Sequence, residues 1–355
     1  MHLQELLQSA VEQQASDVYI IAGRPLSMRL KGVVQITDNE VLMPADTTDL
    51  VNQIYVMSGR DMKKFQNTGD DDFSFAIPGL SRFRVNAFKQ RGSMSAVIRI
   101  ITFEMPDPVK LGIPPYLFDL CDANNGMVLL TGPTGCGKST TLACMVDYIN
   151  KKYCKHVITL EDPIEYLHKH NKSIISQREI TIDSEDYPTA LRASLRQSPD
   201  VIQLGEMRDF ETIRVALTAA ETGHLIFSTL HTVGAANTID RIIDVFPPQQ
   251  QRQIAVQLSM TLNAVISQKL IPDVNGNIIP AFEVMTITPA IRNMIREHKI
   301  PQIDGMLRSS NKPDMIGMDT ALLNLYKARR ITAETAILHS NDTEAMAAQV
   351  KLRLI

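Results

Sequence analysis

The stretch that decides the fold of this chain is Gly132-Pro133-Thr134-Gly135-Cys136-Gly137-Lys138-Ser139-Thr140. It places glycines, a lysine and a hydroxyl residue at the spacing of a phosphate-binding P-loop. A loop that wraps around phosphate must turn its backbone N–H groups inward, and glycine permits both the close approach and the dihedral angles. We therefore predict that all these residues bind the phosphates of a nucleotide. Lys138 would contact the outer phosphates, and the Ser139 hydroxyl would bind Mg²⁺.

The residues on both sides of the loop fit a strand, a loop and a helix in succession. The apolar run Met127-Val128-Leu129-Leu130 before the loop is typical of a buried strand. After the loop, Leu142, Met145, Val146 and Ile149 follow the spacing of one helix face. A helix that begins at the end of the loop presents its free N–H groups to bound phosphate. This context favours a nucleotide site over an ordinary glycine turn.

Length, composition and charge indicate an ordinary globular protein of two domains. The chain has 355 residues, of which 44% are hydrophobic and 21% charged. We find no apolar run as long as a membrane span and no basic segment typical of a signal peptide. We therefore expect a cytoplasmic protein without membrane insertion. The net charge of −3, with no block of Lys or Arg, disfavours direct binding to nucleic acid.

The four cysteines follow neither a disulfide nor a zinc pattern, which fits a reducing cytosol. Cys136 is the one inside the P-loop, next to the positive end of the predicted helix. Such a position lowers the pKa of a thiol, and oxidation there would block nucleotide binding. The simpler interpretation, which we prefer, is a small residue that fits the loop.

Changes of pattern along the chain predict two domains and a linker. Residues 1–102 combine a helix with alternating, strand-like segments and turn residues, which predicts a small α+β domain. Four prolines between 105 and 115 predict a linker over residues 103–117, because proline resists both helix and central strand. In residues 118–355, apolar strands alternate with helices, which predicts a mostly parallel sheet with both faces covered. The predicted strands of this domain are 127–131, 156–160, 201–204 and 225–230.

Polar residues follow three of these strands, at the edge where parallel sheets bind their ligands. Glu161 follows the second strand, and a carboxylate there can orient or deprotonate an attacking water. Glu206 follows the third strand, where P-loop ATPases hold the acidic group that supports Mg²⁺. His231 follows the fourth strand and is either a sensor of the γ-phosphate or a structural imidazole. Its surroundings lack zinc-site spacing.

The end of the N-terminal domain is predicted to be a hairpin that carries several arginines. Arg82 and Arg84 lie two residues apart on one strand, so their side chains point the same way, and Arg99 lies on the next strand. On charge pattern alone, these arginines are interpreted as a solvated strand face.

Four stretches together resemble the secretion and pilus ATPases of the type II and type IV systems, and within them the PilT-type retraction ATPases. They are the P-loop and the segments 158–165, 199–209 and 222–232. The similarity extends over nearly the whole chain, and residues 290–297 resemble the C-terminal helical segment of the retraction subfamily. The additional N-terminal region and four-cysteine zinc module of many extension and secretion members are not visible. Gln203 departs from the usual aliphatic residue.

The resemblance implies an α/β fold in which a PAS-like N-terminal domain precedes a RecA-like P-loop ATPase domain, with ATP between them. By motif matching, Glu161 is the catalytic carboxylate, and Ser139 and Glu206 hold Mg²⁺. Arg84 and Arg99 match N-domain arginines that contact nucleotide in this family, with Arg82 a weaker match. This contact with nucleotide, which the resemblance implies, replaces the interpretation of the arginines as a solvated strand face.

The resemblance also implies a function and partners. The expected protein is a homohexameric motor that uses ATP hydrolysis to retract a type IV pilus by pilin disassembly, for twitching motility. It would act on an inner-membrane platform protein from the cytoplasmic side, peripheral to the membrane.

Three other functions stay open at this point. A pilus-extension or type II secretion ATPase would share all four stretches. A hexameric nucleic-acid translocase could use the same loop and carboxylates, although the absence of a basic run disfavours it. A regulatory ring that binds ATP without hydrolysing it is disfavoured by the combination of Lys138, Glu161 and Glu206.

Overall fold

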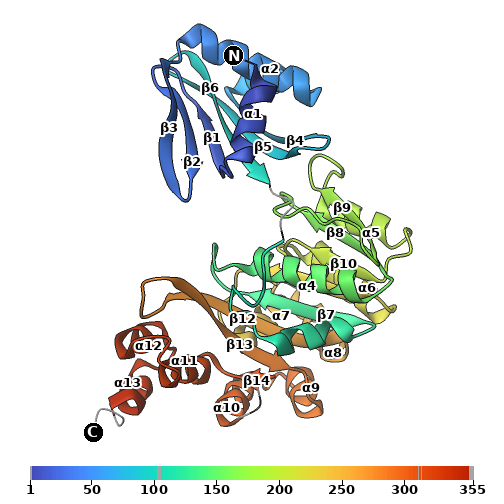
Figure 1. Ribbon diagram of the computed structural model, residues 1–355. Helices are drawn as coiled ribbons and strands as arrows, with labels where there is room; N and C mark the ends of the chain where they lie inside the picture. The colour runs from blue at the N-terminus through green and yellow to red at the C-terminus, as the bar shows by residue number, and fades with distance from the viewer. Residues whose placement is uncertain (1, 102–104, 311, 313, 352–355) are drawn as a thin grey trace. The chain divides into compact units, whose positions relative to one another are not determined.

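The computed structural model describes residues 2–101, 105–310, 312 and 314–351 (Figure 1). The chain divides into two compact units, Met1–Glu104 and Met105–Ile355. The boundary predicted between residues 102 and 103 falls outside the described residues.

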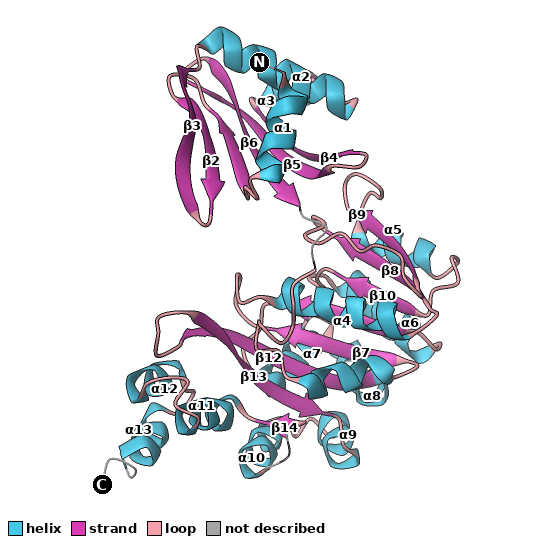
Figure 2. Ribbon diagram, in the orientation of Figure 1, coloured by secondary structure: helices cyan, strands magenta, loops and turns pink. Residues whose placement is uncertain are grey.

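The first unit is a six-stranded antiparallel sheet with helices packed on one face (Figure 2). The strand order is β3-β2-β1-β6-β5-β4. Alternate residues of β5, including Phe83 and Val85, are fully buried against the helices, which is the expected period of a half-covered strand. The predicted hairpin is confirmed as β5 and β6, in which Arg84 lies opposite Arg99. The elements are α1 (Leu3–Glu12), β1 (Asp17–Ile20), β2 (Pro25–Leu30), β3 (Val33–Val41), α2 (Pro44–Ser58), α3 (Lys63–Thr68), β4 (Asp70–Ile77), β5 (Ser81–Gln90) and β6 (Ser93–Ile101).

The second unit is an eight-stranded mixed sheet with helices on both faces (Figure 2). The strand order is β14-β13-β12-β7-β11-β10-β8-β9, in which the strands from β12 to β9 are parallel and β13 pairs antiparallel with both β12 and β14. The four predicted strands are confirmed as β7, β8, β10 and β11. The first elements are the 3-10 helix η1 (Pro115–Asp122), β7 (Gly126–Thr131), α4 (Lys138–Lys152), β8 (His156–Glu161), β9 (Ile174–Glu179), α5 (Tyr187–Ser194), β10 (Val201–Leu204), α6 (Phe210–Glu221) and β11 (Leu225–Leu230).

The remaining elements complete the sheet and add a helical C-terminal region. Helices α11 to α13 pack with the outer parts of β12 and β13 around a separate small core that includes Met318 and Leu322. The elements are α7 (Ala235–Asp244), α8 (Pro248–Thr261), β12 (Leu262–Pro272), β13 (Ile278–Thr286), α9 (Pro289–Arg296), α10 (Pro301–Ser309), β14 (Met315–Ile316), α11 (Met318–Lys327), α12 (Ala333–His339) and α13 (Thr343–Lys351). Within the described part of the chain, no helix combines the length and the apolar character that a membrane span needs.

Strand β7 shows why the P-loop is held firmly. Its side chains alternate between two cores: Met127 and Leu129 join the core that contains α6 and α8, whereas Val128 and Leu130 join the core that contains α4 and η1. All four are fully buried, so the strand reads as a continuous apolar run. The loop that follows β7 therefore starts from a fixed position at the carboxyl edge of the parallel strands.

The segment predicted as a linker contributes to the second unit. Ile113 and Leu117 are buried in the same core as Val128 and Leu130. Helix η1 begins at Pro115, where the missing N–H of proline costs nothing in the first turn. The C-terminal part of the 103–117 segment thus packs as part of this unit.

Candidate functional site

A cavity of about 440 Å³ at the carboxyl edge of the sheet collects most of the predicted residues of the second unit. The P-loop lines one side through Thr134, Gly135 and residues 137–140. Glu161 at the end of β8, Glu206 after β10 and His231 after β11 line the same cavity. Gly132, Pro133 and Cys136 belong to the loop but lie outside this lining. The cavity therefore joins a phosphate-binding loop to two carboxylates and an imidazole.

The P-loop is shaped by two glycines and by Gln268 of β12. Gly132 and Gly137 have φ angles of 140° and 87°. A Cβ atom at Gly132 would lie 2.3 Å from the Gln268 backbone oxygen, so a side chain is excluded there. Gln268 Nε2 donates to the Cys136 carbonyl (2.7 Å), and Thr141 Oγ1 donates to Gln268 Oε1 (2.9 Å). One buried side chain thus ties the loop to the start of α4.

Lys138 is the first residue of α4, and its side chain is directed into the loop. Its Nζ donates to the carbonyl oxygens of Gly132 (2.7 Å) and Pro133 (2.9 Å). Burial lowers the pKa of this ammonium. Phosphate oxygens would make stronger, charge-assisted hydrogen bonds than these carbonyls do. The lysine is therefore placed to exchange loop carbonyls for a phosphate group.

Glu161 carries a buried carboxyl group at the end of β8. Thr159 Oγ1 donates to Glu161 Oε1 (2.6 Å), and Gln177 Nε2 donates to the same oxygen (3.3 Å). Burial raises the pKa of Glu161 to about 7, although these two hydrogen bonds favour the ionised form. A carboxyl group with a pKa near neutrality is suited to accept a proton from water. Its burial and its pKa are the properties that the predicted role of general base needs.

Glu206 and His231 connect the sheet to the P-loop. Glu206 Oε2 forms an ion pair with Arg208, whose Nε lies 2.7 Å away, and it lies 3.3 Å from His231 Nε2. His231 Nδ1 lies 3.4 Å from Thr134 Oγ1 in the loop. The imidazole can donate to only one of these groups when it is neutral. His231 thus contacts both the carboxylate predicted for the metal and the loop predicted for the phosphates.

Several side chains of the cavity had not been predicted from the sequence. Tyr187, Gln203 and Thr229 line it, and Thr229 Oγ1 donates to the Gly205 carbonyl (2.6 Å). At the start of helix α4, Oγ1 of the predicted residue Thr140 lies 2.9 Å from the hydroxyl of Tyr166, which does not line the cavity. Gln203 and Thr229 share a sequence feature, a polar side chain within an apolar strand, whereas Tyr187 begins helix α5. Of these two residues, only Gln203 stands out in the sequence, as a departure from an aliphatic residue.

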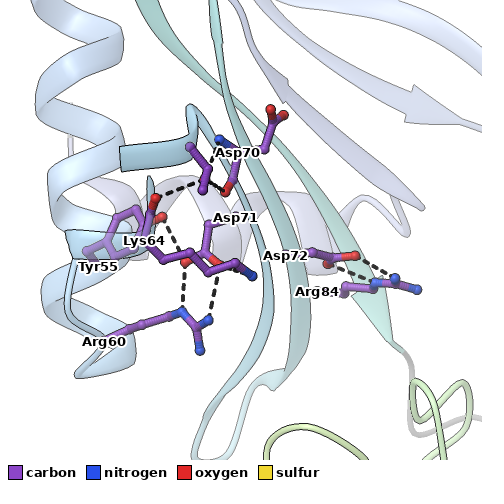
Figure 3. Close-up of polar contacts among 8 residues, drawn as sticks. Tyr55, Arg60, Lys64, Asp70, Asp71, Asp72 and Arg84 are labelled. Atoms are coloured by element: carbon purple, nitrogen blue, oxygen red, sulfur yellow. Dashed lines mark hydrogen bonds and ion pairs between the residues drawn. The ribbon is translucent and has the colours of Figure 1, made fainter. Parts of the chain in front are cut away.

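The two predicted arginines belong to the first unit, where each pairs with a carboxylate. Arg84 makes a bidentate pair with Asp72, with Nε to Oδ1 at 3.1 Å and Nη2 to Oδ2 at 2.7 Å (Figure 3). Arg99 Nε donates to Asp17 Oδ1 at 3.2 Å. Both guanidinium groups are partly exposed, and ion pairs of this kind contribute little to stability. The predicted contact of Arg84 and Arg99 with nucleotide stays a prediction.

Asp71, which precedes Asp72 in β4, has a structural role. Asp71 is buried and accepts hydrogen bonds from Arg60 (2.8 and 3.0 Å) and the Tyr55 hydroxyl (3.2 Å), and it pairs with Lys64 (3.0 Å) (Figure 3). These contacts tie β4 to helices α2 and α3. Successive aspartates of β4 thus serve different faces of the sheet.

The part of the Cys136 hypothesis that concerns the thiol pKa is wrong. Burial raises the pKa of this thiol, and the nearby Lys138 ammonium opposes that shift only in part. The lowered pKa expected from the helix dipole is therefore not found. The preferred interpretation of a small residue that fits the loop agrees with its burial.

Known proteins resemble the chain over nearly its full length. The model of the family described as "Type II/IV secretion system protein" matches residues 1–352. The "Type IV pilus retractation ATPase PilT" of Pseudomonas aeruginosa is 44% identical over 337 residues, which cover 95% of this chain and 97% of the relative. A "Twitching motility protein" of Neisseria gonorrhoeae is 41% identical, with coverage of 96% and 91%. The solved structure "Crystal Structure of the Pilus Retraction Motor PilT and Bound ADP" matches with a TM-score of 0.89 at 45% identity, over 97% of this chain and 98% of that one.

Proposed function

Because the chain belongs to the type II/IV secretion system protein family, we propose that it is an ATPase motor that drives type IV pilus retraction. The observation that carries the proposal is the cavity in which a P-loop faces a buried carboxyl group of raised pKa. The relatives that are named for retraction and twitching motility match 95% and 96% of this chain, which favours retraction over extension or secretion.

ATP would bind with its phosphates on the P-loop. A second cavity of about 280 Å³ shares Gly137 and Thr140 with the first, and apolar side chains such as Val109, Leu111 and Leu270 line it. A nucleotide whose phosphates lie against the start of α4 can extend its base into this second cavity. Apolar walls suit the faces of a purine ring.

The metal ion would be Mg²⁺, held by the Ser139 hydroxyl and the Glu206 carboxylate together with phosphate oxygens. Both residues line the cavity and supply the oxygen ligands that Mg²⁺ prefers. Among the described residues, no group of three His, Cys, Asp or Glu side chains could hold a metal, so we expect the ion to arrive with the nucleotide. When bound, it would neutralise charge that develops on the phosphates.

In the proposed hydrolysis, the side chains of Glu161 and Lys138 act on the attacking water and on the phosphates. The Glu161 carboxylate accepts a proton from water while the water oxygen forms a bond to the γ-phosphorus. The bond from the γ-phosphorus to the bridging oxygen breaks, its electrons remain on ADP, and inorganic phosphate leaves. Lys138 and the N–H groups of the loop stabilise the negative charge. Phosphoryl transfer of this kind is catalysed mainly by positioning and charge.

The assembly and the arginines complete the proposal. We propose that Arg84 and Arg99 contact the nucleotide, where a fixed guanidinium stabilises transition-state charge. Each would first have to leave its carboxylate partner, Asp72 or Asp17, at a small cost for partly exposed pairs. Six subunits would form a ring, and nucleotide-driven closure would pass through an inner-membrane platform protein to the pilus.

Deletion of the gene tests retraction against extension. We expect cells that lose twitching while keeping abundant surface pili, because assembly continues without disassembly. Restoration by the wild-type gene but not by Lys138→Ala would tie the phenotype to the nucleotide site. Cells without pili would contradict retraction and support an extension ATPase, and unchanged twitching would contradict both.

The raised pKa of Glu161 predicts the pH dependence of ATP hydrolysis. Below a pH of about 7 the carboxyl group is protonated and cannot accept a proton from water, so kcat/KM for ATP should fall about tenfold per pH unit. An enzyme whose general base had the ordinary glutamate pKa of 4.5 would keep its kcat/KM down to a pH about two units lower. The affinity of Glu161→Gln for ATP at the same pH values is the control for effects on binding. A flat profile from pH 5 to 8 would contradict the assignment.

A further inference from the structure

Gln203 in the middle of β10 is a polar residue without a visible structural purpose. Its side chain is 5% exposed and lines the cavity, and its Oε1 is buried without a hydrogen-bond partner among the described residues. A buried polar atom left without a hydrogen-bond partner destabilises the folded state. Thr131 and Ser228 also have buried hydroxyl oxygens without partners, but neither lines the cavity. Gln203 is therefore the member of this set that faces the proposed reaction.

The register of the sheet places Gln203 beside the proposed general base. Thr159 of β8 lies opposite Gln203 of β10 on one side and opposite Gln177 of β9 on the other. The three side chains thus form a polar row across neighbouring strands, on one face of the sheet. Two members of the row, Thr159 and Gln177, donate to Glu161 Oε1. The Glu161 carboxyl group is thus bonded to two members of the row, and it lines the same cavity as Gln203, whose amide oxygen has no partner among the described residues.

On the basis of the ATP hydrolysis proposed above, we propose that Gln203 is a positioning residue that holds the attacking water next to Glu161. A water molecule has two protons, so two acceptors are needed to fix its orientation. With one proton directed to Glu161 and the other to Gln203 Oε1, an oxygen lone pair is left for the γ-phosphorus. The terminal torsion of a glutamine is broad and roughly two-fold, so its amide can turn the oxygen towards the cavity. An amide in this role orients the nucleophile without adding negative charge near the triphosphate.

The position argues against a purely structural role. Ile202 and Leu204, the neighbours of Gln203 in β10, are fully buried aliphatic residues that fill the core. An aliphatic side chain at 203 would fill the same space without leaving a polar atom unpaired. The amide is therefore a cost to the folded state that a hydrogen bond to water would offset.

Gln203→Met tests this role, because methionine has a similar length but no amide acceptor. We expect kcat for ATP to fall about tenfold, since a misplaced nucleophile is used inefficiently. KM for ATP should change less than about twofold, and the melting temperature should stay the same or rise because an unpaired buried polar atom is removed. If this variant does not fold, Gln203→Leu takes its place with the same expectations.

The outcomes separate this inference from the proposed function. An unchanged kcat in the variant, or a fall in kcat that accompanies a matching loss of thermal stability, would overturn the positioning role. If Glu161→Gln loses turnover while Gln203→Met keeps it, only the role of Gln203 fails. If Glu161→Gln also hydrolyses ATP normally, the mechanism proposed for the cavity fails with it.

Discussion

Glu161→Gln is expected to bind ATP as tightly as the unaltered chain and to hydrolyse it about 100- to 10,000-fold more slowly. Glutamine has the shape of glutamic acid, so it keeps the hydrogen bond from Thr159 and leaves the cavity intact. It cannot accept a proton from water. Because Glu161 is buried and lies beside the phosphate-binding loop, no solvent base can replace it at the same position.

Single-turnover phosphate release and equilibrium ATP binding measure the two halves of this prediction. Glu165→Gln is the matched control, because Glu165 lines the same cavity but is exposed, and we expect that variant to keep most of its turnover. Normal turnover in Glu161→Gln would remove Glu161 from its proposed role. Loss of turnover in the Glu165 variant alone would transfer the role to that carboxylate.

Lys138→Ala is expected to weaken ATP binding about 10- to 100-fold, which corresponds to a lost hydrogen bond to a charged group of about 1.5–3 kcal/mol. The side chain also holds the loop through the carbonyl oxygens of Gly132 and Pro133, so its removal leaves the loop less well shaped for phosphate. Equilibrium binding of a fluorescent ATP analogue measures the loss.

Lys151→Ala is the control for charge, because Lys151 lies near the end of the same helix and pairs with Asp147 at the surface. We expect this variant to bind ATP normally, although it loses the same positive charge as Lys138→Ala. Equal weakening in both variants would mean that general electrostatics, rather than a contact in the loop, accounts for binding.

Much of the fold was predictable because a strand that is buried on both faces appears in the sequence as a continuous run of apolar residues. The run before the P-loop became β7, and the alternation of strands and helices became the parallel part of the sheet. Strands β9 and β12 were not predicted. Strand β9 carries half-exposed polar residues such as Gln177, and β12 contains the buried polar residue Gln268, so neither has a simple pattern. Their places depend on pairing with distant strands, which local sequence does not reveal.

The candidate site was predictable in its residue types but not in its electrostatics. Carboxylates after parallel strands must lie at one edge of the sheet, so Glu161 and Glu206 were found. The raised pKa of Glu161 depends on burial by surrounding elements, and burial likewise raises the pKa of the Cys136 thiol, which the helix position alone would lower. The link between Gln268 and the loop joins residues more than 100 positions apart, and no motif spacing contains it.

The most direct test of the account is steady-state phosphate release by the full chain with ATP and Mg²⁺. The central claim is that the P-loop cavity hydrolyses ATP. We predict sustained release by the unaltered chain that is abolished in Glu161→Gln, although that variant still binds ATP. Phosphate release that does not exceed that of Glu161→Gln, from a chain that binds ATP, would contradict the claim.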